Sequence, residues 1–194
     1  GPAGPAVPRP PTSAGGRYSE TGSIRGVSCL ADYHVGNNNT ECVVCDAGTA
    51  SEAESEACTN CDAGSYSTTG SAECAPCASG TAANSSGLPS CTTCEVGYYQ
   101  PSTGSTVCLE CAPGTFAPAA GQTACNDCDA GKYSESAAAS CITCAGGLYS
   151  HAGARNCTPC FAGTYSEVGA ASCILCGAGT YTADLGAGSC TRCS

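Results

Sequence analysis

The sequence has very few large apolar side chains. Methionine and tryptophan are absent from its 194 residues, and Leu, Ile, Val and Phe together number 19. A chain so poor in apolar surface cannot offset the conformational entropy lost on folding by burying a conventional core. The sequence therefore predicts either disorder or a fold held together by covalent crosslinks or metal ions.

Long hydrophobic runs and groupings of catalytic residue types are also missing. No apolar run is long enough to cross a membrane, and no signal peptide is evident. Because the chain lacks Met and begins GPAGPAVPRPP, we interpret it as a processed mature form or part of a longer precursor. The two histidines, His34 and His151, stand far apart in the sequence. In a linear repeat array only neighbouring repeats touch, so we expect no Ser-His-Asp or Cys-His grouping, no cofactor and no enzymatic activity.

Basic residues are scarce. Six Lys and Arg stand against 16 Asp and Glu, which gives a formal net charge of −10 at pH 7. This balance argues against nucleic acid and anionic membranes as partners. Half of the basic residues, Arg9, Arg17 and Arg25, lie in the first 28 residues, and the remainder of the chain is acidic. The cationic segment is therefore predicted to dock along the acidic repeats of a neighbouring copy of the chain. The alternative is that this segment is a solvated linker.

Cysteine is the residue that the sequence has in excess. Its 21 cysteines exceed the fraction that is typical of disulfide scaffolds. Zinc sites of four thiolates, drawn from the C-x-x-C pairs, are the alternative, but zinc knuckles usually accompany basic surfaces that serve nucleic acid. A redox-active C-x-x-C of the thioredoxin kind would need a βαβ pattern, which is absent. We therefore expect structural disulfides, no metal site and an extracellular location.

The cysteines follow a regular repeat. From Cys42 onward, C-x-x-C pairs begin every 16 or 17 residues, and Cys29 stands alone ahead of them. The third residue after the opening cysteine of each unit is usually Gly, and a second Gly often follows. These features predict a small hairpin with strand-forming residues between two glycine turns. An aromatic residue stands two positions after the first glycine in seven units, at Tyr66, Tyr99, Phe116, Tyr133, Tyr149, Tyr165 and Tyr181.

These aromatic rings have two interpretations. We expect each ring to cover its own disulfide and that of the neighbouring unit. A stripe of tyrosines that binds a ligand is the alternative.

Several disulfide pairings are compatible with this spacing. Joining the two cysteines within each C-x-x-C would give strained rings that restrain little of the chain. Alternating pairing, first to third and second to fourth, remains possible. We favour closure of each loop, because it uses Cys29 and explains the constant loop length; Cys193 is then unpaired or intermolecular. The pairs are Cys29–Cys42, Cys45–Cys58, Cys61–Cys74, Cys77–Cys91, Cys94–Cys108, Cys111–Cys125, Cys128–Cys141, Cys144–Cys157, Cys160–Cys173 and Cys176–Cys190.

Two regions of different composition follow from this pattern. Residues 1–28 form a Pro/Gly-rich segment, for which polyproline II or disorder is expected. Residues 29–194 form the tandem cysteine-rich repeats of 16–17 residues. The predicted fold class is small disulfide-rich β, an elongated solenoid of about ten disulfide-stapled β-hairpin repeats with little helix, on the order of 100 Å long.

Surface modification and calcium binding are two further possibilities. Asn38, Asn84 and Asn156 each begin an N-x-[ST] sequon, which suits an extracellular glycoprotein, and O-linked sugars on the N-terminal prolines are a further hypothesis. Aspartates recur directly after an opening cysteine, at Asp46, Asp62 and Asp129. They lack the dense oxygen-ligand spacing of calcium loops, so we expect them to start turns instead of binding calcium.

The loop pattern C-x-x-G-T-Y-S-x-x-x-G-x-x-x-C, followed by x-x-C, resembles the ephrin-receptor-like cysteine-rich repeat. It is more distantly similar to the first loop of tumour-necrosis-factor-receptor modules. The stretches that match best are CFAGTYSEVGAASCILC, CDAGSYSTTGSAECAPC and CAPGTFAPAAGQTACNDC. Two units lack the aromatic, and residues 29–42 lack the glycine, so the first units are expected to be irregular caps.

The resemblance implies an extracellular rod with loop-closing disulfides. Such repeats occur in receptors and in surface-fibre proteins such as those of algal flagellar hairs (mastigonemes). The function we predict is a structural glycoprotein subunit of an extracellular filament, coat or cell-surface hair, secreted or at the cell surface, which self-associates or binds other surface proteins. The alternative is the ectodomain stalk of a receptor or adhesion protein with a protein-binding face.

Overall fold

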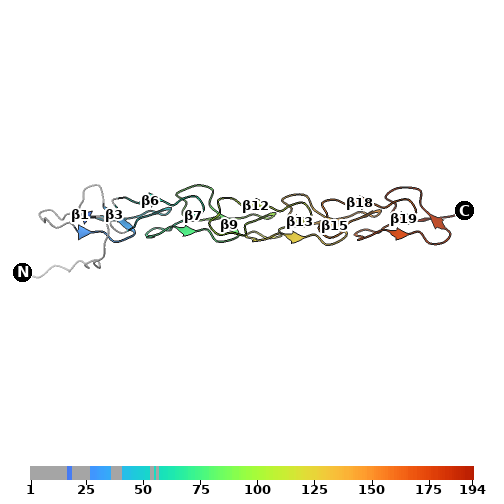
Figure 1. The fold of residues 1–194 in the computed structure, drawn as a ribbon, viewed down its shortest axis with the longest axis horizontal. Helices are drawn as coiled ribbons and strands as arrows, with labels where there is room; N and C mark the ends of the chain where they lie inside the picture. The colour runs from blue at the N-terminus through green and yellow to red at the C-terminus, as the bar shows by residue number, and fades with distance from the viewer. Residues whose placement is uncertain (1–16, 19–26, 36–40, 53–54, 56) are drawn as a thin grey trace, which may run out of the picture. The chain divides into compact units, whose positions relative to one another are not determined.

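The computed structural model describes residues 17–18, 27–35, 41–52, 55 and 57–194. These residues form short strands and turns, with no helix among them. The chain divides into two compact units, which are residues 1–77 with 83–91 (unit 1) and residues 78–82 with 92–194 (unit 2). Within each unit, successive hairpins follow one another in chain order (Figure 1).

Each sheet consists of one antiparallel pair of strands. The pairs are β1 (Arg17–Tyr18) with β2 (Val27–Ser28), β3 (Tyr33–Val35) with β4 (Cys42–Val44), β5 (Thr49–Ala50) with β6 (Thr59–Asn60), β7 (Ser65–Tyr66) with β8 (Ala75–Pro76), β9 (Thr81–Ala82) with β10 (Thr92–Thr93), β11 (Tyr98–Tyr99) with β12 (Leu109–Glu110), β13 (Thr115–Phe116) with β14 (Asn126–Asp127), β15 (Lys132–Tyr133) with β16 (Ile142–Thr143), β17 (Leu148–Tyr149) with β18 (Thr158–Pro159), β19 (Thr164–Tyr165) with β20 (Ile174–Leu175), and β21 (Thr180–Tyr181) with β22 (Thr191–Arg192). The expected small disulfide-rich β fold is confirmed for the described residues.

Ten disulfides each join an opening cysteine to the closing cysteine 13 or 14 residues later. They define loops 1 to 10, which run over 29–42, 45–58, 61–74, 77–91, 94–108, 111–125, 128–141, 144–157, 160–173 and 176–190. The bonds are those of the loop-closing scheme. In loops 1 to 9 the opening cysteine is at most 1% exposed, and every closing cysteine is half-buried.

A tight turn at the start of each loop explains the first glycine. In loop 6 the N–H of Thr115 donates to the Ala112 carbonyl, and Gly114 between them has a φ of 91°. A positive φ at the third position is what a type II turn requires, and glycine adopts it without a steric penalty. Loop 1 has Asp32 at this position with a φ of 83°, so its irregular sequence adopts the same turn.

The second strand of each disulfide-closed hairpin includes the two-residue link inside C-x-x-C. In loop 6, Phe116 pairs with Asn126 and Thr115 with Asp127, and both partners lie between Cys125 and Cys128. The link therefore has two tasks, because it joins successive disulfides and also completes the hairpin of the loop before it.

Neighbouring loops are joined by backbone and serine hydrogen bonds. In unit 2 the N–H of Gly147 donates to the Ser166 carbonyl at 2.8 Å, and the Ser166 hydroxyl donates to the Leu148 carbonyl at 3.0 Å. In unit 1 Gly48 and Ser67 make the corresponding backbone bond at 2.9 Å. The residue six positions after the opening cysteine is buried in loops 2 to 9, as Ser, Ala or Gln. The interior of the array is therefore sulfur, methyl and satisfied hydroxyl groups, with no buried side-chain N or O atom left unpartnered among the described residues.

Glycines also bring together loops that are two apart along the chain. A Cβ atom built on Gly147 of loop 8 would lie 1.8 Å from the carbonyl oxygen of Gly186 in loop 10. The same approach joins Gly48 to Gly87 within unit 1, at 2.1 Å. No side chain larger than hydrogen fits at such a separation. Gly48 and Gly147 are thus required twice, by their positive φ and by this contact.

The segment before Cys29 contains one hairpin without a disulfide. Strand β1 pairs with β2 in the register Arg17↔Ser28 and Tyr18↔Val27. The same spacing is found in the loops, where Tyr66 pairs with Ala75 and Ser65 with Pro76. This hairpin therefore follows the repeat spacing inside the predicted Pro/Gly-rich segment 1–28. The other residues of that segment, including its prolines and Arg9 and Arg25, lie outside the described residues.

Candidate functional site

Two of the three predicted glycosylation residues lie within the described part of the chain. Asn84 and Asn156 are both exposed, as an acceptor asparagine has to be, and Asn38 lies outside the described residues. Asn156 and Arg155 line an open hollow of about 440 Å³ with residues of two earlier loops, Pro113, Glu135 and Ser136. A sugar on Asn156 would leave the chain beside this hollow.

The predicted aromatic positions are only partly covered. The six rings of loops 3 and 5 to 9 are half-buried, whereas Tyr181 of loop 10 is 52% exposed. Half-buried rings agree with a packing role, and they also leave ring edges on the surface. The predicted tyrosine ligand stripe stays a prediction.

The recurring aspartates start turns. The carbonyl of Asp46 accepts both the N–H and the hydroxyl of Thr49, at 3.0 and 2.8 Å, and Asp62 does the same for Ser65. Their carboxylates are exposed, and that of Asp129 forms an ion pair with Lys132 at 3.7 Å. A hollow of about 450 Å³ in unit 1 is lined by Glu52, Asp62 and Glu73, among others.

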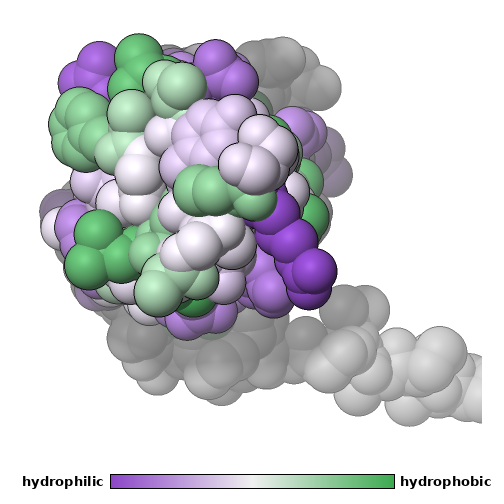
Figure 2. All heavy atoms as spheres, turned by 90° about the vertical axis from the view of Figure 1, so that its right-hand side faces the viewer, coloured by the Kyte–Doolittle hydropathy of each residue, from purple (hydrophilic) through white to green (hydrophobic). Residues whose placement is uncertain are grey.

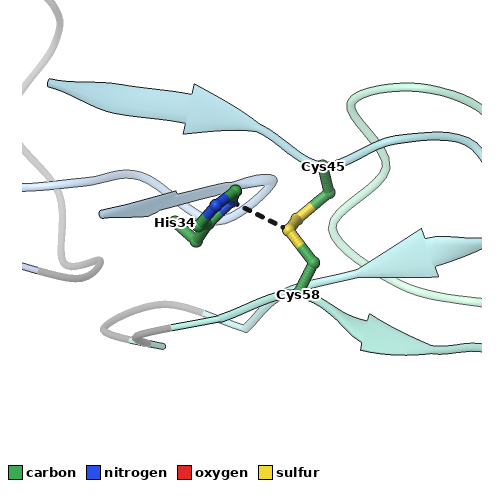
Figure 3. Close-up of side chains that lie close together, drawn as sticks. All are labelled: His34, Cys45 and Cys58. Carbon is green, nitrogen blue, oxygen red and sulfur yellow. Dashed lines mark hydrogen bonds between the residues drawn. A yellow bond between two sulfur atoms is a disulfide. The ribbon is translucent and has the colours of Figure 1, made fainter. Parts of the chain in front are cut away.

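His34 lies against a disulfide. Its Nδ1 is 3.1 Å from Sγ of Cys58, and a nitrogen of the ring and both sulfurs of Cys45–Cys58 lie within 4.8 Å of one another (Figure 3). The two sulfurs are bonded to each other, so they are not thiolate ligands for a metal ion. The sequence did not predict that His34 lies beside two cysteines, although these are joined in a disulfide and do not form the catalytic pair of a thiol with a histidine. The other histidine, His151, makes an edge-to-face contact with the ring of Tyr149 at a centroid distance of 5.6 Å.

The position of His34 in the repeat was readable from the sequence. His34 stands five residues after Cys29, which is the aromatic position of the loop. The loop frame that aligns Tyr66 and Phe116 therefore places an imidazole at the same position in loop 1. The distance between the two histidines in the sequence gives no sign of this alignment, which appears only when the loops are compared with one another.

Cys193 is a free, exposed cysteine. Its N–H donates to the Gly179 carbonyl at 2.9 Å, which is the bond that an opening cysteine makes to the preceding loop, as Cys176 does to Gly163. The backbone of Cys193 therefore occupies the same position relative to the preceding loop as that of an opening cysteine.

Large apolar side chains are exposed in loop 9, in the link that follows it and in loop 10. They include Phe161, Val168 and Leu175, which are 70%, 72% and 78% exposed. Figure 2 views the molecule from the side on which the C-terminal end of the chain lies. Apolar residues there alternate with polar ones instead of forming one continuous patch.

Comparison with known families identifies the repeat. The family model described as "Tyrosine-protein kinase ephrin type A/B receptor-like" matches residues 80–128, 102–139 and 163–194, which together cover 80–139 and 163–194. No curated protein shows a significant match to the chain. Among the described residues, no helix is long and apolar enough to span a membrane.

Repeats of this family are typically non-enzymatic and extracellular, which agrees with the many disulfides. The matched loops form hairpins closed by disulfides, as the resemblance implied. The tandem loops of residues 80–139 and 163–194 are ephrin-receptor-like cysteine-rich repeats, the kind of module that is found in extracellular cell-surface proteins.

Proposed function

We propose that the chain is a structural glycoprotein subunit of an extracellular filament, coat or cell-surface hair. The observation that carries this proposal is the way stability is distributed. Each loop has its own disulfide, neighbouring loops are joined by recurring backbone hydrogen bonds, and several first glycines contact the loop two further along the chain. Such an array needs no large hydrophobic core and resists local opening at every loop.

The energetics support a load-resisting role. In the chain-entropy model, a disulfide that closes a loop of this size stabilises the native state by about 3 kcal/mol. An opened loop therefore stays restrained at both ends by its covalent bond. Exposed Asn84 and Asn156 offer positions for N-linked glycans, which would increase solubility and shield the surface.

Self-association is the part of the proposal that is most open to test. We would express residues 1–194 in a secretory host and image the product by negative-stain electron microscopy, with light scattering to measure mass. Filaments, or masses that increase with concentration, are expected. A monomer at all concentrations, with and without glycans, would contradict the filament. A variant without residues 1–28 tests whether the cationic segment contributes to assembly.

A receptor or adhesion ectodomain is the second candidate. Two observations favour it, namely the receptor-like family model and the exposed apolar side chains of loops 9 and 10 and of the link between them. Replacing Phe161 and Leu175 by Ser should then abolish binding of the labelled chain to cells without changing its fold. Binding that survives this double substitution would argue against a protein-binding face on these loops.

A further inference from the structure

The disulfide of loop 2 has a hydrogen-bond donor on its sulfur. A disulfide sulfur carries no hydrogen, so in the contact between His34 and Cys58 the hydrogen belongs to Nδ1 of the ring. Among the described residues, His34 is the only histidine with a hydrogen bond to a disulfide sulfur. In Figure 3 the imidazole ring points toward Sγ of Cys58 from the neighbouring strand β3.

This donor is at the reachable end of the bond. Cys45 is fully buried, so a thiolate from solvent cannot approach its sulfur, whereas Cys58 is half-buried. The residue at the aromatic position of loop 2 itself is Ala50, so this loop contributes no ring of its own there. An attacking thiolate therefore meets Sγ of Cys58, next to Nδ1 of His34.

We propose that Cys45–Cys58 is a thiol–disulfide exchange site for a small dithiol, and that His34 promotes the exchange. In the first step a thiolate of the dithiol bonds to Sγ of Cys58, the bond between Cys58 and Cys45 breaks, and its electron pair leaves on Cys45 as a thiolate. In the second step the other thiolate of the dithiol attacks the dithiol sulfur of this mixed disulfide. The electron pair then leaves on Cys58, and the dithiol departs as an internal disulfide.

His34 acts directly on Cys58, which is the sulfur attacked in the first step and the leaving group of the second, and it lies near Cys45, the leaving group of the first. Nδ1 is 3.1 Å from Sγ of Cys58, and a nitrogen of the same ring lies within 4.8 Å of Sγ of Cys45. Two electrons pass from the dithiol to the disulfide, and the two protons of the dithiol go to solvent or to the new thiolates. Hydrogen bonds to ionised acceptors are stronger than those to neutral ones, so an N–H at this position stabilises thiolate more than disulfide. His34 is thus a positioning donor for the exchange, and Cys58 is the group that reacts.

Two other disulfides provide internal references. Ser150 lies 3.4 Å from Sγ of Cys144, but its hydroxyl donates to the Lys132 carbonyl at 2.8 Å, so its hydrogen is not available to the sulfur. Cys74 lines the hollow that also holds Glu52, Asp62 and Glu73, whose carboxylates repel an approaching thiolate. Both disulfides should react more slowly than Cys45–Cys58.

The experiment measures the rate of reduction bond by bond. The oxidised full chain is exposed to limiting dithiothreitol, quenched with a light alkylating reagent, fully reduced, and then labelled with a heavy form of the reagent. Peptide mass spectrometry gives the reduced fraction of each disulfide over time. Cys45–Cys58 should react about tenfold faster than Cys61–Cys74 and Cys144–Cys157, consistent with one added hydrogen bond to a charged sulfur.

His34→Phe is the matched control, because loop 6 naturally carries Phe116 at the same position. This substitution should slow reduction of Cys45–Cys58 about tenfold and leave the other nine rates unchanged. Tyr66→His places an imidazole at the aromatic position of loop 3 and should accelerate Cys77–Cys91 in turn. The proposal is overturned if Cys45–Cys58 reacts no faster than the references, or if His34→Phe leaves its rate unchanged or raises it. If His34→Phe does not fold, Tyr66→His decides, and an unchanged Cys77–Cys91 rate then overturns the proposal.

Discussion

Loops 1 and 2 differ from loops 6 to 8 in side chains but share their geometry. Loops 6 to 8 have Gly at the first turn and a ring two positions later, whereas loop 1 has Asp32 and His34 there, and loop 2 has Ala50 in place of the ring. The turn of loop 1 nevertheless has the same positive φ, and the disulfides close loops of nearly the same length. The repeat is therefore defined by its disulfides and backbone hydrogen bonds, and the side chains between them can vary and take on other tasks.

The largest effect is expected from removing a disulfide in each region. Cys128→Ala with Cys141→Ala and Cys45→Ala with Cys58→Ala each open a loop with a sequence separation of 13. If loop-closure entropy dominates, both pairs should lower the free energy of unfolding by about 2–5 kcal/mol. Urea denaturation of the oxidised proteins measures it. A clearly smaller loss in loop 2 would show that native contacts, which differ between the loops, contribute more than loop closure.

The next largest loss of stability is expected from substituting Gly147, which occupies the first-glycine position of loop 8. Gly147→Ala forces a methyl group onto the Gly186 carbonyl and requires alanine at a φ of 86°, so it should cost about 2–4 kcal/mol. Gly179→Ala is the control, because it has a φ of 77° but nothing within 4 Å of the added Cβ. It should cost only the backbone term, about 1 kcal/mol. Equal losses in the two variants would contradict the contact between loops 8 and 10.

A smaller loss of stability is expected from removing the hydroxyl group of the buried Ser134. Ser134→Ala removes the hydroxyl that donates to the Thr115 carbonyl at 2.8 Å, and should cost about 1 kcal/mol. Loop 6 tolerates Ala117 at the corresponding position, so the variant should keep the fold. Hydrogen exchange of the Gly114 amide, which donates to the Ser134 carbonyl at 3.0 Å, is the local measurement. Unchanged exchange and stability would mean that the hydroxyl adds nothing to the join between loops.

The smallest change, and the only increase in stability among these variants, is expected from substituting Asp32. Asp32→Gly relieves a non-glycine residue at a φ of 83° and makes loop 1 resemble loops 6 to 8. Glycine also loses more chain entropy on folding, so the net stabilisation should be about 0.5–1 kcal/mol. The midpoint of thermal unfolding should rise slightly. A lower midpoint would indicate that the Asp32 side chain makes a favourable interaction that outweighs its backbone strain.

Local features of the fold were predictable from the sequence, and contacts between loops were not. The glycine at Gly114, the strand at Thr115 and the period of the cysteines all follow from spacing within one loop. The contact of Gly147 with Gly186 spans three loops, and no pattern within a loop specifies it. Asn126 and Asp127 have low strand propensity, and they pair because the disulfides at each side hold them in place.

The candidate site was predictable to a similar degree. The sequons Asn84 and Asn156 and the free Cys193 follow from the motifs and from the parity of the cysteine count. The contact of His34 with Cys58 depends on which loop lies beside which, although the repeat frame already placed His34 at a ring position. The burial of Ser166 could not be predicted, because nothing in the sequence of a single loop distinguishes a buried serine from an exposed one.

The approach of glycines two loops apart has a consequence for how such chains can grow and be cut. The shortest stretch that contains one whole contact of this kind runs from loop 2 to loop 4, that is, across three successive disulfides. Fragments with fewer than three units lack it altogether, while added units can supply further contacts without altering those already present. Recombination that duplicates or deletes whole units should accordingly preserve the architecture, and truncation below three units should release the chain to proteases.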